Sequence, residues 1–121
     1  MKLARYNIII GVVLLLFASC GQQQQAKSVV KEFMEKQLVD ASELSYIDFA
    51  NLDSTRVVSD SLLHDMRNRK SEHYTMPSHY ADSPSGKLFM MRVSYRLGTD
   101  TCSATFYFDA GISGVVAFKE N

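Results

Sequence analysis

LFMMRVSYRLGTDTCSATFYF, residues 88–108, decides the fold of this chain. Two runs of alternating apolar and polar residues flank residues 98–101, and a period of two is typical of a strand buried on one face. The apolar positions are Phe89, Met91, Val93, Tyr95, Leu97, Cys102, Ala104, Phe106 and Phe108. The stretch therefore predicts an antiparallel hairpin with one face in the core and one in water.

The turn between the two runs sets their pairing. A four-residue loop over 98–101 predicts the opposed pairs Leu97 with Cys102, Tyr95 with Ala104, Val93 with Phe106, and Met91 with Phe108. The wet face is expected to carry Arg92, Ser94, Arg96, Ser103, Thr105 and Tyr107. A second turn through Gly111 and Gly114 leads to a last strand, in which Val116 and Phe118 are expected to face inward.

The region before the hairpin predicts an amphipathic helix over residues 26–40. Its apolar stripe consists of Val30, Phe33, Met34 and Leu38. Its polar face consists of Lys31, Glu32, Glu35 and Lys36. The polar face is mixed in charge rather than basic, which favours packing on the sheet over binding to a membrane surface.

A short strand and a second helix are expected next. Residues 45–52 alternate, with Ile47 and Phe49 on one face. The helix is expected to be capped by Ser59 or Asp60 and to present Leu62, Leu63 and Met66 as its apolar face. Arg67, Arg69 and Lys70 crowd its last turn, where cations favour the helix dipole; the alternative is a patch for phosphate or an acidic partner.

A long loop, residues 71–86, connects this helix to the hairpin. It holds both prolines, Pro77 and Pro84, and two His-Tyr pairs, His73-Tyr74 and His79-Tyr80. The loop is expected to fold its aromatic side chains over one edge of the sheet, and a binding loop is the alternative.

Together these elements predict an α+β fold, with one or two helices packed on a roughly four-stranded antiparallel sheet. The element order over residues 26–121 is similar in outline to the cystatin-like and nuclear-transport-factor-like families, in which a curved sheet wraps a helix and sometimes leaves a pocket. That resemblance carries no functional residue across. Residues 27–121 are expected to form a single domain.

Composition limits the function classes. The chain has 121 residues, 46% hydrophobic and 21% charged, which suits one small globular domain. Thirteen basic and thirteen acidic residues cancel, so no nucleic-acid partner is expected.

The first residues have the profile of a signal peptide. Lys2 and Arg5 precede an apolar run, residues 8–18, which is shorter than the about 20 residues a membrane span needs. The segment Phe17-Ala18-Ser19-Cys20 resembles a bacterial lipobox, in which small residues precede a cysteine that is acylated and becomes the new N-terminus. The alternatives are an ordinary secretory signal cut near Ser19 and a buried N-terminal helix.

The lipobox resemblance implies that residues 1–19 are removed and that Cys20 carries diacylglycerol and N-acyl chains, anchoring the protein in the bacterial envelope. More than one chain is needed for firm anchoring. Residues 20–26 are then expected to be a flexible, polar tether between lipid and domain. In lipoproteins of Gram-negative type, Gly21 stands where an aspartate often causes retention in the inner membrane, which implies the outer membrane.

The sequence offers no catalytic or metal-binding signature. Cys102 is expected to be a small buried hydrophobe without a disulfide partner in the chain. The three histidines, His64, His73 and His79, have no metal-site spacing. The sequence gives no indication that the candidate carboxylates Asp48, Asp53 and Asp60 lie near one another. We therefore expect no cofactor and no bound metal.

The leading interpretation is a lipid-anchored, non-enzymatic envelope protein that binds another envelope protein. The alternative is a carrier of a small ligand, with an apolar pocket between sheet and helix. A third hypothesis, an enzyme that uses His64 or His79 with a carboxylate, has the least support in the sequence.

Overall fold

The computed structural model describes residues 21–55, 58–77, 79–82 and 88–121. The expected signal peptide, Cys20 and Pro84 lie outside the described residues. Residues 21–37 form the N-terminal helix. The remaining elements are η1 (Ala41–Glu43), β1 (Leu44–Phe49), β2 (Asp53–Thr55), α2 (Asp60–Asn68), β3 (Leu88–Leu97), β4 (Asp100–Phe108) and β5 (Val115–Glu120).

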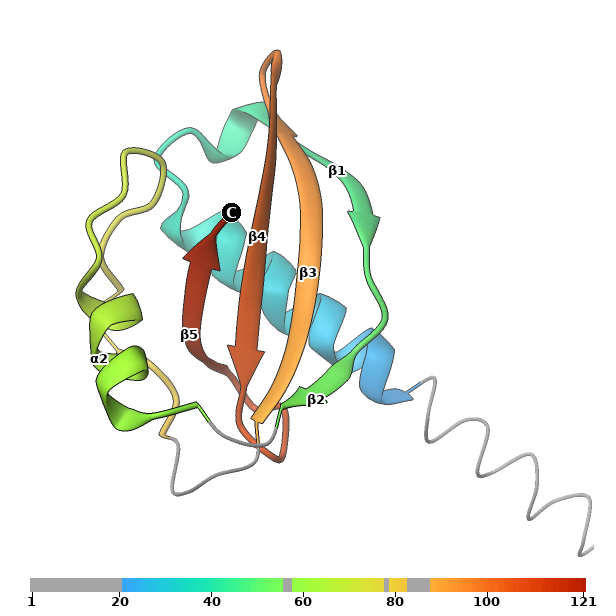
Figure 1. The fold of residues 1–121 in the computed structure, drawn as a ribbon. Helices are drawn as coiled ribbons and strands as arrows, with labels where there is room; N and C mark the ends of the chain where they lie inside the picture. Colours follow the sequence, from blue (N-terminus) through green and yellow to red (C-terminus); the bar gives the residue numbers. More distant parts are fainter. Residues whose placement is uncertain (1–20, 56–57, 78, 83–87) are drawn as a thin grey trace, which may run out of the picture.

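The strands form one antiparallel sheet in the order β1-β3-β4-β5, and β2 also pairs with β3. β1 and β2 lie beside successive parts of β3 and so behave as one interrupted edge strand. Figure 1 shows the N-terminal helix crossing one face of this sheet, with α2 beside the β5 edge. The predicted α+β fold with helices packed on an antiparallel sheet is confirmed.

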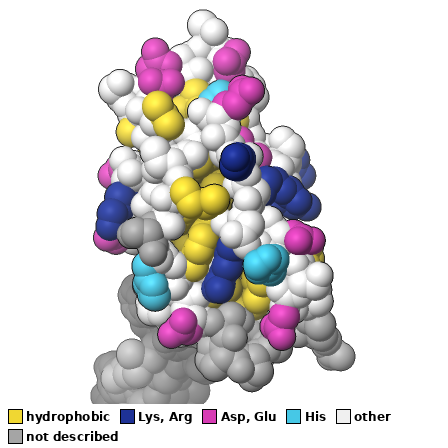
Figure 2. Space-filling model, turned by 90° about the vertical axis from the view of Figure 1, so that its left-hand side faces the viewer, with side chains coloured by type: hydrophobic (Ala, Val, Ile, Leu, Met, Phe, Trp, Pro, Cys, Tyr) yellow, Lys and Arg dark blue, Asp and Glu magenta, His cyan; other side chains and the backbone are white. Residues whose placement is uncertain are grey.

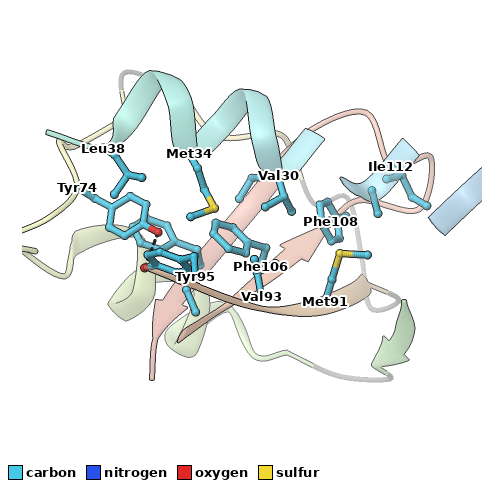
Figure 3. Close-up of a cluster of buried hydrophobic side chains, with 14 of the residues drawn as sticks. Val30, Met34, Leu38, Tyr74, Met91, Val93, Tyr95, Phe106, Phe108 and Ile112 are labelled. Atoms are coloured by element: carbon cyan, nitrogen blue, oxygen red, sulfur yellow. Dashed lines mark hydrogen bonds between the residues drawn. The ribbon is translucent and has the colours of Figure 1, made fainter. Parts of the chain in front are cut away.

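The core lies between the N-terminal helix and the sheet. Val30 and Met34 point from the helix toward Phe106 and Phe108 of the sheet, and Leu38, just after the helix, lies beside Tyr74 (Figure 3). This confirms the predicted helical stripe. Because buried apolar area is the main favourable term in folding, this interface carries most of the domain's stability.

The pairing within the hairpin differs from the predicted pairing by two residues. The turn has two residues, Gly98 and Thr99, so Leu97 lies opposite Asp100, and Tyr95 lies opposite Cys102. Gly98 has a φ of 63°, and a positive φ at this position is what a two-residue hairpin turn requires. The predicted buried face is correct nonetheless, because a shift of two leaves every side chain on its side of the sheet.

Ile47 and Phe49 do not share one face of β1 as predicted, because the strand contains a β-bulge. Tyr46 lies opposite Tyr95, but Asp48 lies opposite the next residue, Ser94. Ile47 is the extra residue of the bulge and is 51% exposed. The bulge resets the alternation, so Tyr46 and Phe49 pack against the core instead.

The last strand contains a second irregularity. The predicted inward residues Val116 and Phe118 are both buried, but in different clusters. Phe118 packs in the main core, whereas Val116 packs with Leu63 and Met66 of α2, because the register shifts at this point of the β4–β5 pairing. The expected wet face is thus partly covered, and Thr105 on it is 6% exposed.

The start of α2 agrees with the prediction. The Oγ of Ser59 accepts a 3.1 Å hydrogen bond from the backbone N–H of Leu62, which identifies Ser59 as the N-cap. Leu63 and Met66 are buried as expected. Leu62 is 44% exposed, so its placement on the apolar face was wrong.

The structure also differs from the expected flexible tether at residues 21–26. Residues 21–25 are helical. The amide of Gln23 donates to the carbonyl oxygen of Ala50 (3.1 Å) and accepts from the backbone N–H of Leu52 (2.6 Å). Ala26 is fully buried. Two of the four glutamines that suggested a tether, Gln23 and Gln25, instead bind backbone groups of the domain.

Candidate functional site

Arg67 fixes one end of the loop that follows α2. Its Nε donates to the carbonyl oxygen of Val116 (2.9 Å), and its Nη2 donates to the carbonyl oxygen of Ala81 (3.0 Å). Its guanidinium also lies 5.3 Å from the ring centroid of Tyr80. One of the three charges noted at the helix end therefore holds the loop against β5.

Tyr74 fixes the other end of the loop. Its side chain is 4% exposed, and its hydroxyl donates a 2.8 Å hydrogen bond to the hydroxyl of Tyr95 in β3. Its ring centroid lies 4.7 Å from that of Phe118 in β5. The backbone N–H of Thr75 donates to the carbonyl oxygen of Gln37, at the end of the N-terminal helix. The predicted folding of loop aromatics onto the sheet edge is confirmed for Tyr74.

A pocket of about 190 Å³ opens between this loop, α2 and β5. We call it the Tyr80 pocket. It is lined by Arg69, Lys70, Ser71, Tyr74, Thr75, Met76, Pro77, Tyr80 and Phe118. Figure 2 faces this side of the molecule and shows hydrophobic side chains in its middle, with Lys, Arg, His, Asp and Glu side chains around them.

The pocket combines an aromatic floor with a basic rim. Tyr74, Tyr80 and Phe118 supply the aromatic rings, while Arg69 and Lys70 are exposed. Burial raises the pKa of the Tyr74 and Tyr80 hydroxyls, the latter opposed by the nearby Arg67 guanidinium, so both are neutral at neutral pH. No acidic side chain is among the described residues that line the pocket.

Other hollows lie elsewhere on the described residues. One, of about 510 Å³, is lined by Gln22, Gln23, Gln24, Asn51, Leu52, Asp53, Ser54 and Phe89. The other, of about 170 Å³, is lined by Val29, Glu32, Phe33, Lys36, Gln37, His79, Ser113, Gly114 and Val115. The first is rich in side-chain amides, and the second places His79 on the same hollow as Glu32.

Of the three histidines considered in the sequence, His64 lies on α2, and His73 and His79 lie in the loop that follows it. His64 is exposed on α2, and its ring lies 3.3 Å from the side-chain amide of Asn68. His73 is in the loop beside Tyr74, and its backbone carbonyl accepts from Val39. Within the described ranges, no group of three or more His, Cys, Asp or Glu side chains is placed to hold a metal ion.

The three carboxylates considered in the sequence lie on different elements, with Asp48 on β1, Asp53 on β2 and Asp60 on α2. Sequence reasoning missed a fourth, Asp109. Burial alone would raise the pKa of Asp109, but hydrogen bonds from Ser113 and from the backbone of Gly114 lower it below its usual value. The carboxylate closes the turn between β4 and β5 and is a structural group.

Cys102 is half-buried against the main core. Burial raises the pKa of its thiol, and the nearby Asp100 and Glu120 carboxylates raise it further. A thiol with a raised pKa is a poor nucleophile at neutral pH. This environment agrees with the predicted role as a small hydrophobe.

No family model, curated protein or solved structure matches this chain. In the described part of the chain, no helix has both the length and the apolar character that crossing a membrane requires.

Proposed function

We propose that this chain is a lipid-anchored binding domain of the bacterial cell envelope, held in the membrane through Cys20, and that it docks a partner protein in the Tyr80 pocket. The observation that carries the proposal is the pocket itself, an aromatic hollow with a basic rim between the loop and β5. The lipobox-like segment ending at Cys20 supports the anchor.

The size of the pocket favours a side chain over a free small molecule. Its volume of about 190 Å³ is below the 300 to 1,000 Å³ of ordinary small-molecule sites. A hollow of this size admits one apolar or aromatic side chain, and single anchors of this kind dominate many protein interfaces. Tyr80, which is partly exposed, would form the aromatic contact surface, because Phe118 is only 8% exposed.

The basic rim favours a partner with acidic residues next to the inserted side chain. Arg69 and Lys70 are exposed beside the opening, so an acidic residue next to the inserted side chain would pair with them. The partner segment is therefore an apolar side chain flanked by carboxylates.

The pocket is already formed in the free chain. The bonds of Arg67 to Val116 and Ala81 fix one wall, and the bond of Tyr74 to Tyr95 fixes the other. A preformed site loses little conformational freedom on binding, which favours affinity.

The alternative of a small apolar ligand between sheet and helix has weaker support. Val30, Met34, Phe106 and Phe108 are all fully buried and fill that layer. The pockets described above open at the surface instead.

Photo-crosslinking in intact cells tests the proposal. A photoreactive residue replaces Met76, which is 56% exposed on the pocket rim, and the matched control replaces Ile47, which is 51% exposed on β1. We expect a discrete adduct with an envelope protein from position 76 and none from position 47. Peptide mapping should place the adduct on an apolar residue of the partner with acidic neighbours.

Charge reversal sharpens the test. Arg69→Glu with Lys70→Glu should abolish the adduct, whereas Arg92→Glu with Lys119→Glu, at exposed positions of the sheet, should leave it unchanged. An adduct that survives reversal of the rim, or equal adducts from positions 76 and 47, would contradict docking in the Tyr80 pocket.

A further inference from the structure

We infer that the N-terminal helix is a rigid spacer that fixes the domain's orientation on the membrane, with one end against the lipid headgroups and the Tyr80 pocket directed away from them. The inference rests on the proposed lipid anchor at Cys20. In this arrangement a defined surface of the domain, and not a flexible tether, meets the membrane. The pocket is then held above the bilayer.

The helix is bonded to the domain where it approaches Cys20. Gln23 bonds to the backbone of Ala50 and Leu52. The Nε2 of Gln25 donates to the carbonyl oxygens of Ile112 (3.0 Å) and Gly111 (3.2 Å). Two separate loops are therefore clamped to the same two turns of helix, which follow Cys20 directly in the sequence.

We define the anchor end as residues 21–25, 50–54 and 109–113. In Figure 1 the N-terminal helix begins its described course beside β2, at the opposite end of the sheet from the β3–β4 turn. Acyl chains on Cys20 would enter the bilayer within one residue of Gly21. The anchor end is then the part of the domain that lies closest to the headgroups.

The surface chemistry of the anchor end fits contact with headgroups rather than insertion into hydrocarbon. Gln22, Gln24 and Asn51 are exposed there, together with the carboxylate of Asp53. The large hydrophobic side chains that are exposed among the described residues are Val39, Ile47, Leu62 and Met76. None of these belongs to the anchor end, so the lipid would hold the domain while its polar amides meet the headgroups.

The Tyr74–Thr75 side of the pocket lies at the other end of the helix, whereas the segment around Tyr80 and Ala81 runs beside Val115. Thr75, a pocket residue, bonds to Gln37, and Leu38 pairs with Tyr74. With a rise of about 1.5 Å per residue, Gly21 and Gln37 are separated by about 24 Å along the helix axis. The pocket is thus presented to a protein beyond the headgroup layer and not to lipid.

Energy transfer to the membrane surface tests the orientation. Full-length protein carrying Cys102→Ser is purified with its acyl chains and given one new cysteine, either Ser113→Cys at the anchor end or Thr99→Cys in the β3–β4 turn, both exposed positions. Each is labelled with a donor dye and reconstituted in phosphatidylethanolamine and phosphatidylglycerol vesicles that carry an acceptor on the headgroups. The expected result is much higher transfer efficiency from position 113 than from position 99.

A control variant and a mass measurement distinguish failure of the fixed orientation from failure of the lipid anchor. Inserting a ten-residue Gly-Ser segment between Cys20 and Gly21 should remove the difference between the two positions. Acylated protein without the insert that gives equal transfer from both positions would overturn the fixed orientation and leave the lipid anchor standing. Protein whose intact mass shows no acyl chains would overturn the anchor and this inference together.

Discussion

The hydroxyl of Tyr74 donates a hydrogen bond of 2.8 Å to the hydroxyl of Tyr95, and this bond ties the loop of the pocket to the central strand β3. Both side chains are almost fully buried, at 4% and 1% exposure. A buried hydroxyl without a partner is destabilising, so each tyrosine satisfies the other. The wall of the pocket and the core of the sheet are therefore coupled.

Removing both hydroxyls should cost less than the sum of the costs of removing each one alone. Tyr74→Phe leaves the Tyr95 hydroxyl buried without its partner and is expected to lower the free energy of unfolding by about 1 to 2 kcal/mol. The double variant with Tyr95→Phe should be less destabilised than the sum of the two single variants. Urea unfolding of the four proteins gives this double-mutant cycle, and strict additivity would show that the bond contributes nothing.

The tyrosine pair also predicts an alkaline limit to stability. Burial raises the pKa of Tyr95 from 10.0 to about 12, an effect partly offset by the bond from Tyr74, and burial raises the pKa of Tyr74 as well. Above pH 10 the unfolded chain releases protons that the folded chain retains, so the stabilisation present below pH 10 is lost as the pH rises toward 12.

Urea unfolding across this pH range measures that loss. The double variant Tyr74→Phe with Tyr95→Phe should show a shallower decline than the wild type. Tyr46, whose pKa burial and the nearby Glu35 raise to about 12, is present in both proteins and contributes equally. Parallel declines in the two proteins would contradict the role of the buried pair.

Arg67 should not tolerate replacement by lysine. Arg67→Lys loses the planar fork that reaches the carbonyl oxygens of Val116 and Ala81 at once, and we expect a loss of about 2 kcal/mol of unfolding free energy. The matched control is Arg69→Lys at an exposed position, which should change stability by less than about 0.5 kcal/mol. Thermal unfolding compares them, and equal effects would mean that Arg67 is only a surface charge.

The clamp at the start of the helix can be tested by substitution in the full chain. Gln23→Ala removes both bonds to the 50–52 segment and should destabilise the protein by about 1 to 2 kcal/mol. Gln24→Ala, at an exposed position between the two bonding glutamines, is the control.

Hydrogen exchange gives a local measure of the same clamp. The backbone N–H of Leu52 donates to Gln23, so its exchange should accelerate in Gln23→Ala and not in Gln24→Ala. Unchanged exchange at Leu52 would show that the first helical turns are not fastened to the domain.

Periodicity in the sequence was enough to find most elements and most of the core. The helical stripe of Val30, Met34 and Leu38 and the buried face of the hairpin both follow from spacing alone. Pairing details did not follow, because turn length depends on the local conformation of Gly98 and because the bulge at Ile47 resets the alternation of β1.

The site was harder to predict, because its key contacts join residues that are distant in the sequence. In the sequence, Arg67 is one of three charges at a helix end. Its hydrogen bonds to two backbone carbonyl oxygens depend on where β5 and the loop meet, which the sequence does not show. The glutamines near Cys20 were predicted to form a tether because they are polar. Composition does not reveal that they bond to backbone groups of Ala50, Leu52 and Ile112, which are distant in the sequence. The His-Tyr loop was the one useful signal, since Tyr74 and Tyr80 do shape the pocket.

The most direct test of the account is intact mass spectrometry of membrane-extracted protein, comparing the wild type with Cys20→Ser. We expect a mature chain that begins at Cys20 and carries acyl mass, with both the added mass and the membrane retention lost in the variant. An unmodified chain that begins at another residue and leaves the membrane without detergent would contradict the anchor, and with it the oriented pocket.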